Sequence, residues 1–344
     1  MEDSTLQISS HYSYYRIIAL WVFCEGFVGG IIHGLKLPIS GIVVGSCAIV
    51  CICLIKQHNN TKGSIIKATI IVAIFKMMLS PQAPPTAYVA VFFQGIIGEL
   101  FLKNNSYIKY KIVFFSLIAL IESGLQRIFI LTLVYGKNIW LIVDETISKL
   151  FHLQTIAAFS KTFITIYLLL HIFAAIIVAI FITQLNQKLA IWSITYRNYF
   201  IKEGSISSNY LSLLQPTAKN KNTFYWLFIY ILLLLLYLNA NGLIAKPLVE
   251  KNIVLQVILR STLILLSWYL IIGPLISKLL NKWLSKQQSK WQKDITEVLL
   301  LLPQIKTIVH KSWSLSCTKK GLKRLALCSK IILINTLQKH YNAQ

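Results

Sequence analysis

Residues 64–102 read SIIKATIIVAIFKMMLSPQAPPTAYVAVFFQGIIGELFL, two apolar runs separated by a short segment that contains three prolines. Proline lacks the backbone N–H and restricts the residue before it, so the segment cannot continue a helix. The runs Ser64–Ser80 and Thr86–Leu102 are each about long enough to span a membrane, which takes roughly 17–25 apolar residues. The stretch therefore predicts two short transmembrane helices joined by a stiff corner.

The composition extends this prediction to the whole chain of 344 residues. Hydrophobic residues make up 56%, charged residues only 13%, and the mean hydropathy is +0.65. Soluble domains carry about 25% charged residues, and disordered chains have low hydrophobicity. Six cysteines are too few for a secreted disulfide scaffold. The sequence predicts an all-α fold, a polytopic integral membrane helix bundle with about eight transmembrane helices and a basic helical cytoplasmic tail.

Eight apolar stretches are long enough to be these helices. They are Ile17–Leu35, Ile39–Ile55, Ser64–Ser80, Thr86–Leu102, Ile112–Tyr135, Thr162–Gln184, Thr223–Ala245 and Ile253–Ile276. The segment Asn138–Lys161 is interpreted as an amphipathic helix outside the membrane. The alternative is an extra span, which would invert everything that follows it.

Positive charge supports this count. With the N-terminus inside, the loops and the tail place 25 Lys and Arg on the inner side and 6 on the outer side. Cytoplasmic loops carry such an excess, so we expect both termini in the cytoplasm of a multi-pass protein of a bacterial inner membrane. The net charge of +23 is then typical of contact with anionic lipid rather than nucleic acid.

The chain divides into four predicted parts. These are a six-helix, substrate-binding module at 1–190, a cytoplasmic interfacial linker at 191–222, two further transmembrane helices at 223–276 and the basic tail at 277–344. The tail holds 13 Lys and Arg against Asp294 and Glu297. We expect it to contact lipid or to couple the protein to a partner.

Ionisable residues inside predicted spans are costly and are functional hypotheses by default. The alternative is that they pair only to close the bundle, or that those near span ends reach the interface. They are Glu25, Lys76, Glu99, Glu122, Arg127 and Arg260.

Glycines mark one face of the first span. Gly26, Gly30 and Gly34 recur every four residues, which lets another backbone approach closely. We predict that Gly26 and Gly30 line a substrate cavity; plain helix packing is the alternative.

The corner formed by Pro81, Pro84 and Pro85 is followed by hydrogen-bonding side chains in an apolar helix. Tyr88 and Gln94 suit a small ligand with polar and apolar parts, and we predict that both contact substrate. In a regular helix they lie about 240° apart, so a shared cavity needs a distorted first turn. A rigid corner with an interfacial tyrosine is the alternative.

No pattern points to an enzyme, a cofactor or a metal. Cys47, Cys51 and Cys53 with His33 do not have zinc-ligand spacing, and no paired CxxC motif is present. Hydrolase, kinase and nucleotide-binding signatures are absent from the sequence. If ATP drives the protein, we expect another chain to bind it.

Residues 15–185 resemble the substrate-binding membrane subunit, the S component, of energy-coupling factor (ECF) transporters. The resemblance rests on short glycine-rich helices and on the corner that reads PPTAY at 84–88. It implies binding of a small nutrient, vitamin-like or a metal, and coupling to external ATPase subunits.

The C-terminal part is similar to a reduced form of the transmembrane coupling subunit of the same transporters. That subunit docks onto ATPases through short basic motifs, and Lys319, Lys320 and Gly321 are the nearest match here. Lysine replaces arginine in this match and lacks its bidentate fork. The alternative function is a non-catalytic membrane scaffold whose tail binds anionic lipid or a cytoplasmic partner.

Overall fold

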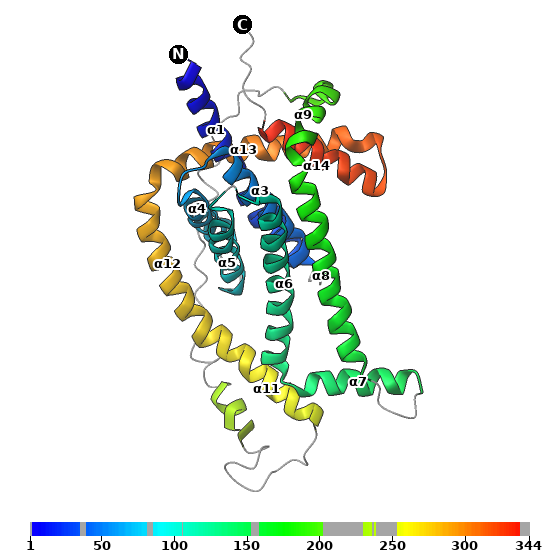
Figure 1. Ribbon diagram of the computed structural model, residues 1–344. Coiled ribbons are helices and arrows are strands. Elements are labelled where there is room, and N and C mark those ends of the chain that lie inside the picture. The colour runs from blue at the N-terminus through cyan, green and yellow to red at the C-terminus, as the bar shows by residue number, and fades with distance from the viewer. Residues whose placement is uncertain are drawn as a thin grey trace. The chain divides into compact units, whose positions relative to one another are not determined.

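The computed structural model describes residues 2–34, 39–80, 85–104, 106–152, 158–201, 230–235, 237–238 and 253–337. Every regular element in these ranges is a helix, which confirms the all-helical class (Figure 1). Five of the helices are long and apolar enough to cross a membrane. They are Tyr12–Ile32, Ser40–His58, Ile108–Tyr135, Phe159–Thr183 and Ile258–Lys290.

The chain forms two compact units. The first combines Met1–Leu120, Phe173–Gln215 and Lys282–Gln344, and the second combines Ile121–Ile172 and Pro216–Asn281. The tail thus belongs to the same unit as the N-terminal helices, although almost the whole chain separates them in sequence.

Four helices form the centre of the first unit: α1 (Glu2–Phe23), α3 (Ser40–His58), α4 (Ser64–Leu79) and α5 (Pro85–Leu102). α3, α4 and α5 begin and end within a few residues of the predicted stretches, whereas α1 begins before Ile17 and ends at Phe23, well before Leu35. Small residues set the spacing, because a Cβ at Gly98 of α5 would lie 2.7 Å from Ile52 of α3. The large side chains Trp21 and Phe75 are fully buried between these helices.

The first apolar run is interrupted by a widened turn. α1 passes into a π-helical turn, η1 (Cys24–Val28), and then into α2 (Gly29–Gly34). The π-helical turn is identified by the hydrogen bond from the Gly29 N–H to the carbonyl of Cys24, which is five residues earlier in the chain. Turns of this π-helical kind are rare in proteins, and those that occur are often found at functional sites.

The first residues of the predicted tail continue α12 (Gly273–Lys290) to its end, and the part after them folds into a helical hairpin against α1. Its parts are α13 (Gln292–Leu315), the short turn η5 (Ser316–Thr318) and α14 (Gly321–Leu337) (Figure 1). Arg16, 3% exposed, donates to the carbonyl of Asn335 over 2.8 Å. The side-chain amide of Asn335 also bonds the backbone at Tyr199 and Ile201, which follow α9 (Leu185–Thr195) and η2 (Arg197–Tyr199).

One part of α6 (Ile108–Tyr135) and one part of α8 (Phe159–Thr183) belong to each unit. Between these two helices in the sequence comes α7 (Asn138–Leu150). α7 is a helix of 13 residues, too short to span a membrane. The Asp144 carboxylate accepts from the backbone N–H and the hydroxyl of Ser160, at 2.6 and 2.9 Å, and so caps the first turn of α8.

The eighth predicted stretch continues further than expected. α11 (Ile253–Ser267), the π turn η4 (Trp268–Ile272) and α12 (Gly273–Lys290) follow one another, so the helix runs past Ile276. Pro274 has no N–H to donate, and the turn before it is widened accordingly. Most of the seventh stretch, Thr223–Ala245, and most of the linker at 191–222 lie outside the described residues.

Candidate functional site

A buried ion pair lies at the centre of the first unit. The Lys76 Nζ is 2.6 Å from the Glu25 Oε2, and the two side chains are 5% and 3% exposed. The same ammonium is 3.4 Å from the carbonyl of Ala87. Three segments that the sequence keeps apart, η1, α4 and α5, therefore meet at one charged contact.

Local backbone structure places both partners. Glu25 is the second residue of the π turn, which shifts the angular position of the side chains that follow it. Lys76 occupies the last turn of α4, where the partial negative charge of the helix C-terminus favours an ammonium. A buried pair costs desolvation, and leaving one partner alone typically costs about 3–5 kcal/mol.

Thiols lie beside the pair. The side chains of Cys24 and Cys47 are hydrogen-bonded, and the Glu25 carboxylate is in electrostatic range of Cys47 and Cys51. Within the described ranges, no three His, Cys, Asp or Glu side chains come together in a way that could hold a metal ion. Cys53, on another side of α3, is buried, and the side chain of His33 is outside the described ones.

The glycine face of the first span packs against the end of α4. A Cβ at Gly26 would lie 3.0 Å from the Leu79 Cδ1, and one at Gly30 would lie 3.9 Å from the Ser80 Oγ. The Ser80 hydroxyl also donates to the carbonyl of Gly26 over 3.4 Å. These glycines therefore permit a close helix–helix contact next to Glu25.

Tyr88 and Gln94 are both buried in α5. The Gln94 amide faces α3, since a Cβ at Gly45 would lie 3.4 Å from its Nε2. Tyr88 directly follows Ala87, whose carbonyl approaches Lys76. Tyr88 is thus next in the chain to the residue whose carbonyl lies beside the ion pair. The amide of Gln94 faces Gly45 and does not face Gly26 or Gly30.

Pro85 opens α5, at a position where a missing N–H costs nothing. Pro81 and Pro84 lie outside the described residues.

Glu99 has a different environment from Glu25. Its two carboxylate oxygens accept the backbone N–H groups of Gly63, at 2.8 Å, and Ile65, at 3.1 Å. These groups belong to the first turn of α4, whose N–H groups have no partner within the helix. Glu99 therefore serves as the cap of α4.

The remaining predicted charges belong to the second unit. Glu122 of α6 has a buried Oε2 with no hydrogen-bond partner among the described residues. Arg127 acts electrostatically on Tyr167 and His171 of α8. The guanidinium of Arg260 lies against the turn at Gly136, where a Cβ would be 3.0 Å from its Nη1.

The residues predicted for coupling lie at the turn of the tail hairpin. Lys319, Lys320 and Gly321 are all exposed, between η5 and α14. Gly321 has a φ of +58°, the left-handed region that favours glycine. The turn presents two ammonium groups on the surface.

One polar cluster was not anticipated from the sequence. Asp294 of α13 pairs with Lys67 of α4 at 2.7 Å and accepts a hydrogen bond from the Tyr15 hydroxyl. The Lys67 ammonium also lies over the ring of Trp291, 5.0 Å from its centre. The available signal was the scarcity of acids in the tail, which makes Asp294 a natural partner for a lysine of another segment.

No protein-family model matches the chain, and no curated protein or solved structure is significantly similar to it.

Proposed function

We propose that the chain is a multi-pass membrane protein that binds a small polar solute in its first unit and transports it with the help of external ATPase subunits. In this proposal the eight apolar stretches are transmembrane helices, and both termini are cytoplasmic.

Exposed apolar surface supports the membrane location. In the most apolar 18-residue windows, only 17% of α6, 22% of α8 and 6% of Ile258–Lys290 is buried. Side chains such as Phe129 and Leu169 are 65% and 56% exposed on these helices. Water-soluble proteins rarely leave apolar patches of this extent uncovered, whereas lipid tails cover them without cost.

The ion pair between Glu25 and Lys76 is the observation that carries the transport proposal. A membrane anchor needs no buried charges, and an apolar contact of the same volume is often at least as stable. Charges inside a membrane bundle are typical of substrate and ion pathways. Here the pair neutralises itself when no solute is present, and a solute with a charged group exchanges with one partner.

Neighbouring groups fit this role. The carbonyl of Ala87 and the hydroxyl of Ser80 stand beside the pair and can bind a polar solute. Tyr88 supplies a further hydrogen-bonding group on α5, whereas the amide of Gln94 faces Gly45 of α3 instead. The glycines Gly26 and Gly30 leave backbone surface that a small solute can approach when α2 and the end of α4 separate.

Coupling would use the tail hairpin. Because α13 and α14 pack on α1, a force applied to the hairpin reaches the helix that carries Glu25. The exposed turn with Lys319, Lys320 and Gly321 is the surface that meets the ATPase subunits. The nutrient class and the ECF type of transport are inferred from the resemblance of residues 15–185.

The test is co-purification of the tagged full chain from its own membranes. We expect ATP-hydrolysing subunits to accompany it. The double variant K319Q/K320Q should reduce their recovery at least tenfold, whereas the control K323Q, at an exposed lysine three residues after Lys320, should not. Recovery of no ATP-hydrolysing chain with the unaltered protein would contradict the coupled-transport proposal.

The second candidate is a non-catalytic membrane scaffold. The observation that favours it is the charge of the tail, 13 Lys and Arg with two acids, which suits anionic lipid. It predicts that E25Q and K76M, which neutralise the buried pair, affect stability alone, and that no solute depends on them.

A further inference from the structure

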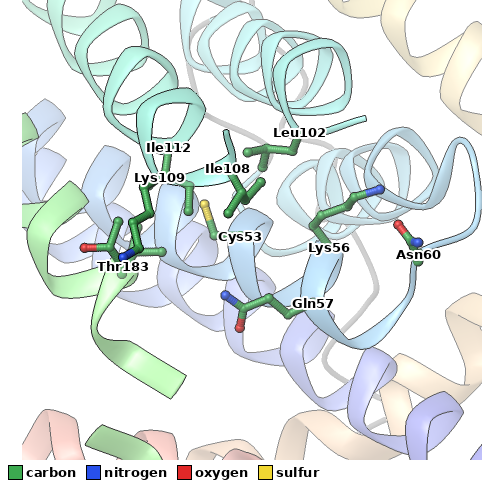
Figure 2. Close-up of a pocket in the computed structure, with 10 residues that line it drawn as sticks. Cys53, Lys56, Gln57, Asn60, Leu102, Ile108, Lys109, Ile112 and Thr183 are labelled. Atoms are coloured by element: carbon green, nitrogen blue, oxygen red, sulfur yellow. The ribbon is translucent and has the colours of Figure 1, made fainter. Parts of the chain in front are cut away.

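The first unit contains a pocket that is separate from the ion pair. Its volume is about 460 Å³, within the range of roughly 300–1,000 Å³ found for small-molecule sites. The C-terminal ends of α3, α5 and α8 and the first turn of α6 surround it (Figure 2). In the proposed topology all four of these helix ends lie at the cytoplasmic side.

Two lysines dominate the polar part of the lining. Lys56 and Lys109 come from α3 and α6, and their side chains extend in opposite directions, Lys109 toward Thr183 and Lys56 toward Asn60 (Figure 2). Gln57, Asn60 and Thr183 add neutral polar groups, and no Asp or Glu is among the ten lining residues. A pocket with two ammonium groups and no carboxylate favours an anion.

The other part of the lining is apolar. Leu102, Ile112 and Ile182 form a buried floor, with 1%, 5% and 1% of their surface exposed. An inorganic anion is not stabilised by contact with these apolar side chains, because it would lose its hydrating water there and form no hydrogen bonds in its place. The lining therefore suits a ligand that combines a charged group with an apolar part.

Apolar surface also continues outside the pocket. On α8, Ile176 is 42% exposed. It lies seven residues before Thr183, which places both side chains on the same face of the helix. A lipid whose headgroup occupies the pocket can lay an acyl chain along this face of α8.

We propose that this pocket binds the phosphate headgroup of an anionic phospholipid of the cytoplasmic leaflet. The inference relies on the topology given above and on no part of the transport mechanism. Lys109 and Thr183 bind the phosphate oxygens, Lys56, Gln57 and Asn60 contact the rest of the headgroup, and the apolar residues receive the glycerol end of the chains. Basic pockets between helices at the cytoplasmic side are typical of such lipid sites.

The test is lipid binding to the purified full chain in detergent, followed by native mass spectrometry. Phosphatidylglycerol and phosphatidylcholine serve as probes, together with sn-glycerol 3-phosphate as a soluble phosphate ester without acyl chains. We expect phosphatidylglycerol to bind at least tenfold more tightly than either of the others. The double variant K56Q/K109Q should remove that preference, and K56R/K109R should retain it.

Matched controls are lysines at the opposite ends of α6 and α8, two of the four helices around the pocket. Lys137 follows α6 and Lys161 lies in the first turn of α8, and both are exposed. K137Q/K161Q removes the same charge and should leave the preference unchanged. Thermal unfolding without added lipid checks that K56Q/K109Q is folded, since Lys56 also donates to the carbonyl of Lys103.

Three outcomes would overturn the proposal. Equal affinity for the two lipids would show that the pocket does not recognise an anionic headgroup. Binding of sn-glycerol 3-phosphate as tightly as phosphatidylglycerol would assign the pocket to a soluble phosphate ester. An equal loss of preference in K56Q/K109Q and K137Q/K161Q would show that overall charge, not this pocket, attracts the lipid.

Discussion

At the scale of single residues, the position of a charge decides its role. Glu25 and Glu99 are both carboxylates on apolar helices, but one pairs with an ammonium and the other with backbone N–H groups. Glu99 accepts hydrogen bonds from backbone N–H groups at the beginning of α4, and every helix has such N–H groups without a partner inside the helix. Glu25 meets no such requirement, and for this reason we base the proposed function on its pairing with Lys76.

The first prediction concerns that pair. K76M leaves a buried carboxylate without its partner and should lower the free energy of unfolding by about 3–5 kcal/mol. The double variant E25Q/K76M removes both charges and should be more stable than K76M alone. Chemical unfolding of the protein in detergent measures both. Equal stability of K76M and the unaltered protein would mean that the pair contributes nothing.

The second prediction concerns two thiols of the tail. Burial raises the pKa of the Cys328 thiol, although a hydrogen bond with Ser316 and the charge of Arg324 act in the opposite direction. A raised pKa leaves less reactive thiolate at pH 8, and Cys328 is buried whereas Cys317 is exposed. We expect iodoacetamide to modify Cys317 at least tenfold faster, as followed by peptide mass spectrometry. Similar rates in the folded protein would contradict this, and the unfolded protein is the control.

At the scale of elements, helix ends are fixed by side chains from other helices. Glu99 of α5 caps α4, and Asp144 of α7 caps α8. Both contacts supply acceptors to N–H groups that the helix leaves without partners. Short helices such as α4, with 16 residues, gain their defined beginnings in this way.

The third prediction follows from the cap on α4. E99A removes an acceptor of two backbone N–H groups and should lower the free energy of unfolding by about 1–2 kcal/mol, as helix-cap losses do. E99Q keeps one acceptor oxygen and should cost less. Thermal unfolding compares the two variants. A larger loss for E99Q than for E99A would contradict the capping role.

The fourth prediction concerns the hairpin. Deleting residues 317–344 removes α14, which packs on α1, and with it the Asn335 carbonyl that accepts a hydrogen bond from Arg16. We expect a clear loss of thermal stability, whereas K319Q/K320Q, at an exposed turn, should unfold at the same temperature as the unaltered protein. Unchanged stability of the deletion would mean that the hairpin does not support α1.

At the scale of the whole molecule, the proposed topology rests on charge and on apolar length. It assigns 25 basic residues to the inner side and 6 to the outer side, and with them the helix ends around the pocket to the inner side. The proposal assigns the tail hairpin, which packs on α1, to the same side.

The fifth prediction tests that topology. In a cysteine-free background, N59C and K188C should resist a membrane-impermeant maleimide added outside intact cells, whereas K137C should react. The reason is that, in the proposed topology, Asn59 and Lys188 follow spans that end on the cytoplasmic side. Lys137 follows a span that ends on the outer side. Labelling of K188C from outside would overturn the arrangement of eight spans.

The sequence by itself determined the all-helical class and most helix positions. Long apolar runs with prolines between them leave few alternatives, because helices satisfy their backbone hydrogen bonds within the segment. The beginning of α4, the end of α5 and the short α7 follow from local composition in this way. The ionisable residues within the runs were visible for the same reason, since each stands out in an apolar context.

Only the tertiary structure decided which of these residues meet. Glu25 and Lys76 are 51 positions apart, and Arg16 and Asn335 are 319 apart. The π turn η1 also changes the phase of the first helix, so a regular period of 3.6 residues does not place the residues that follow the turn. The pocket likewise needs the ends of four helices at once. Such contacts depend on how side chains of separate helices fill a common space, and no single segment encodes that.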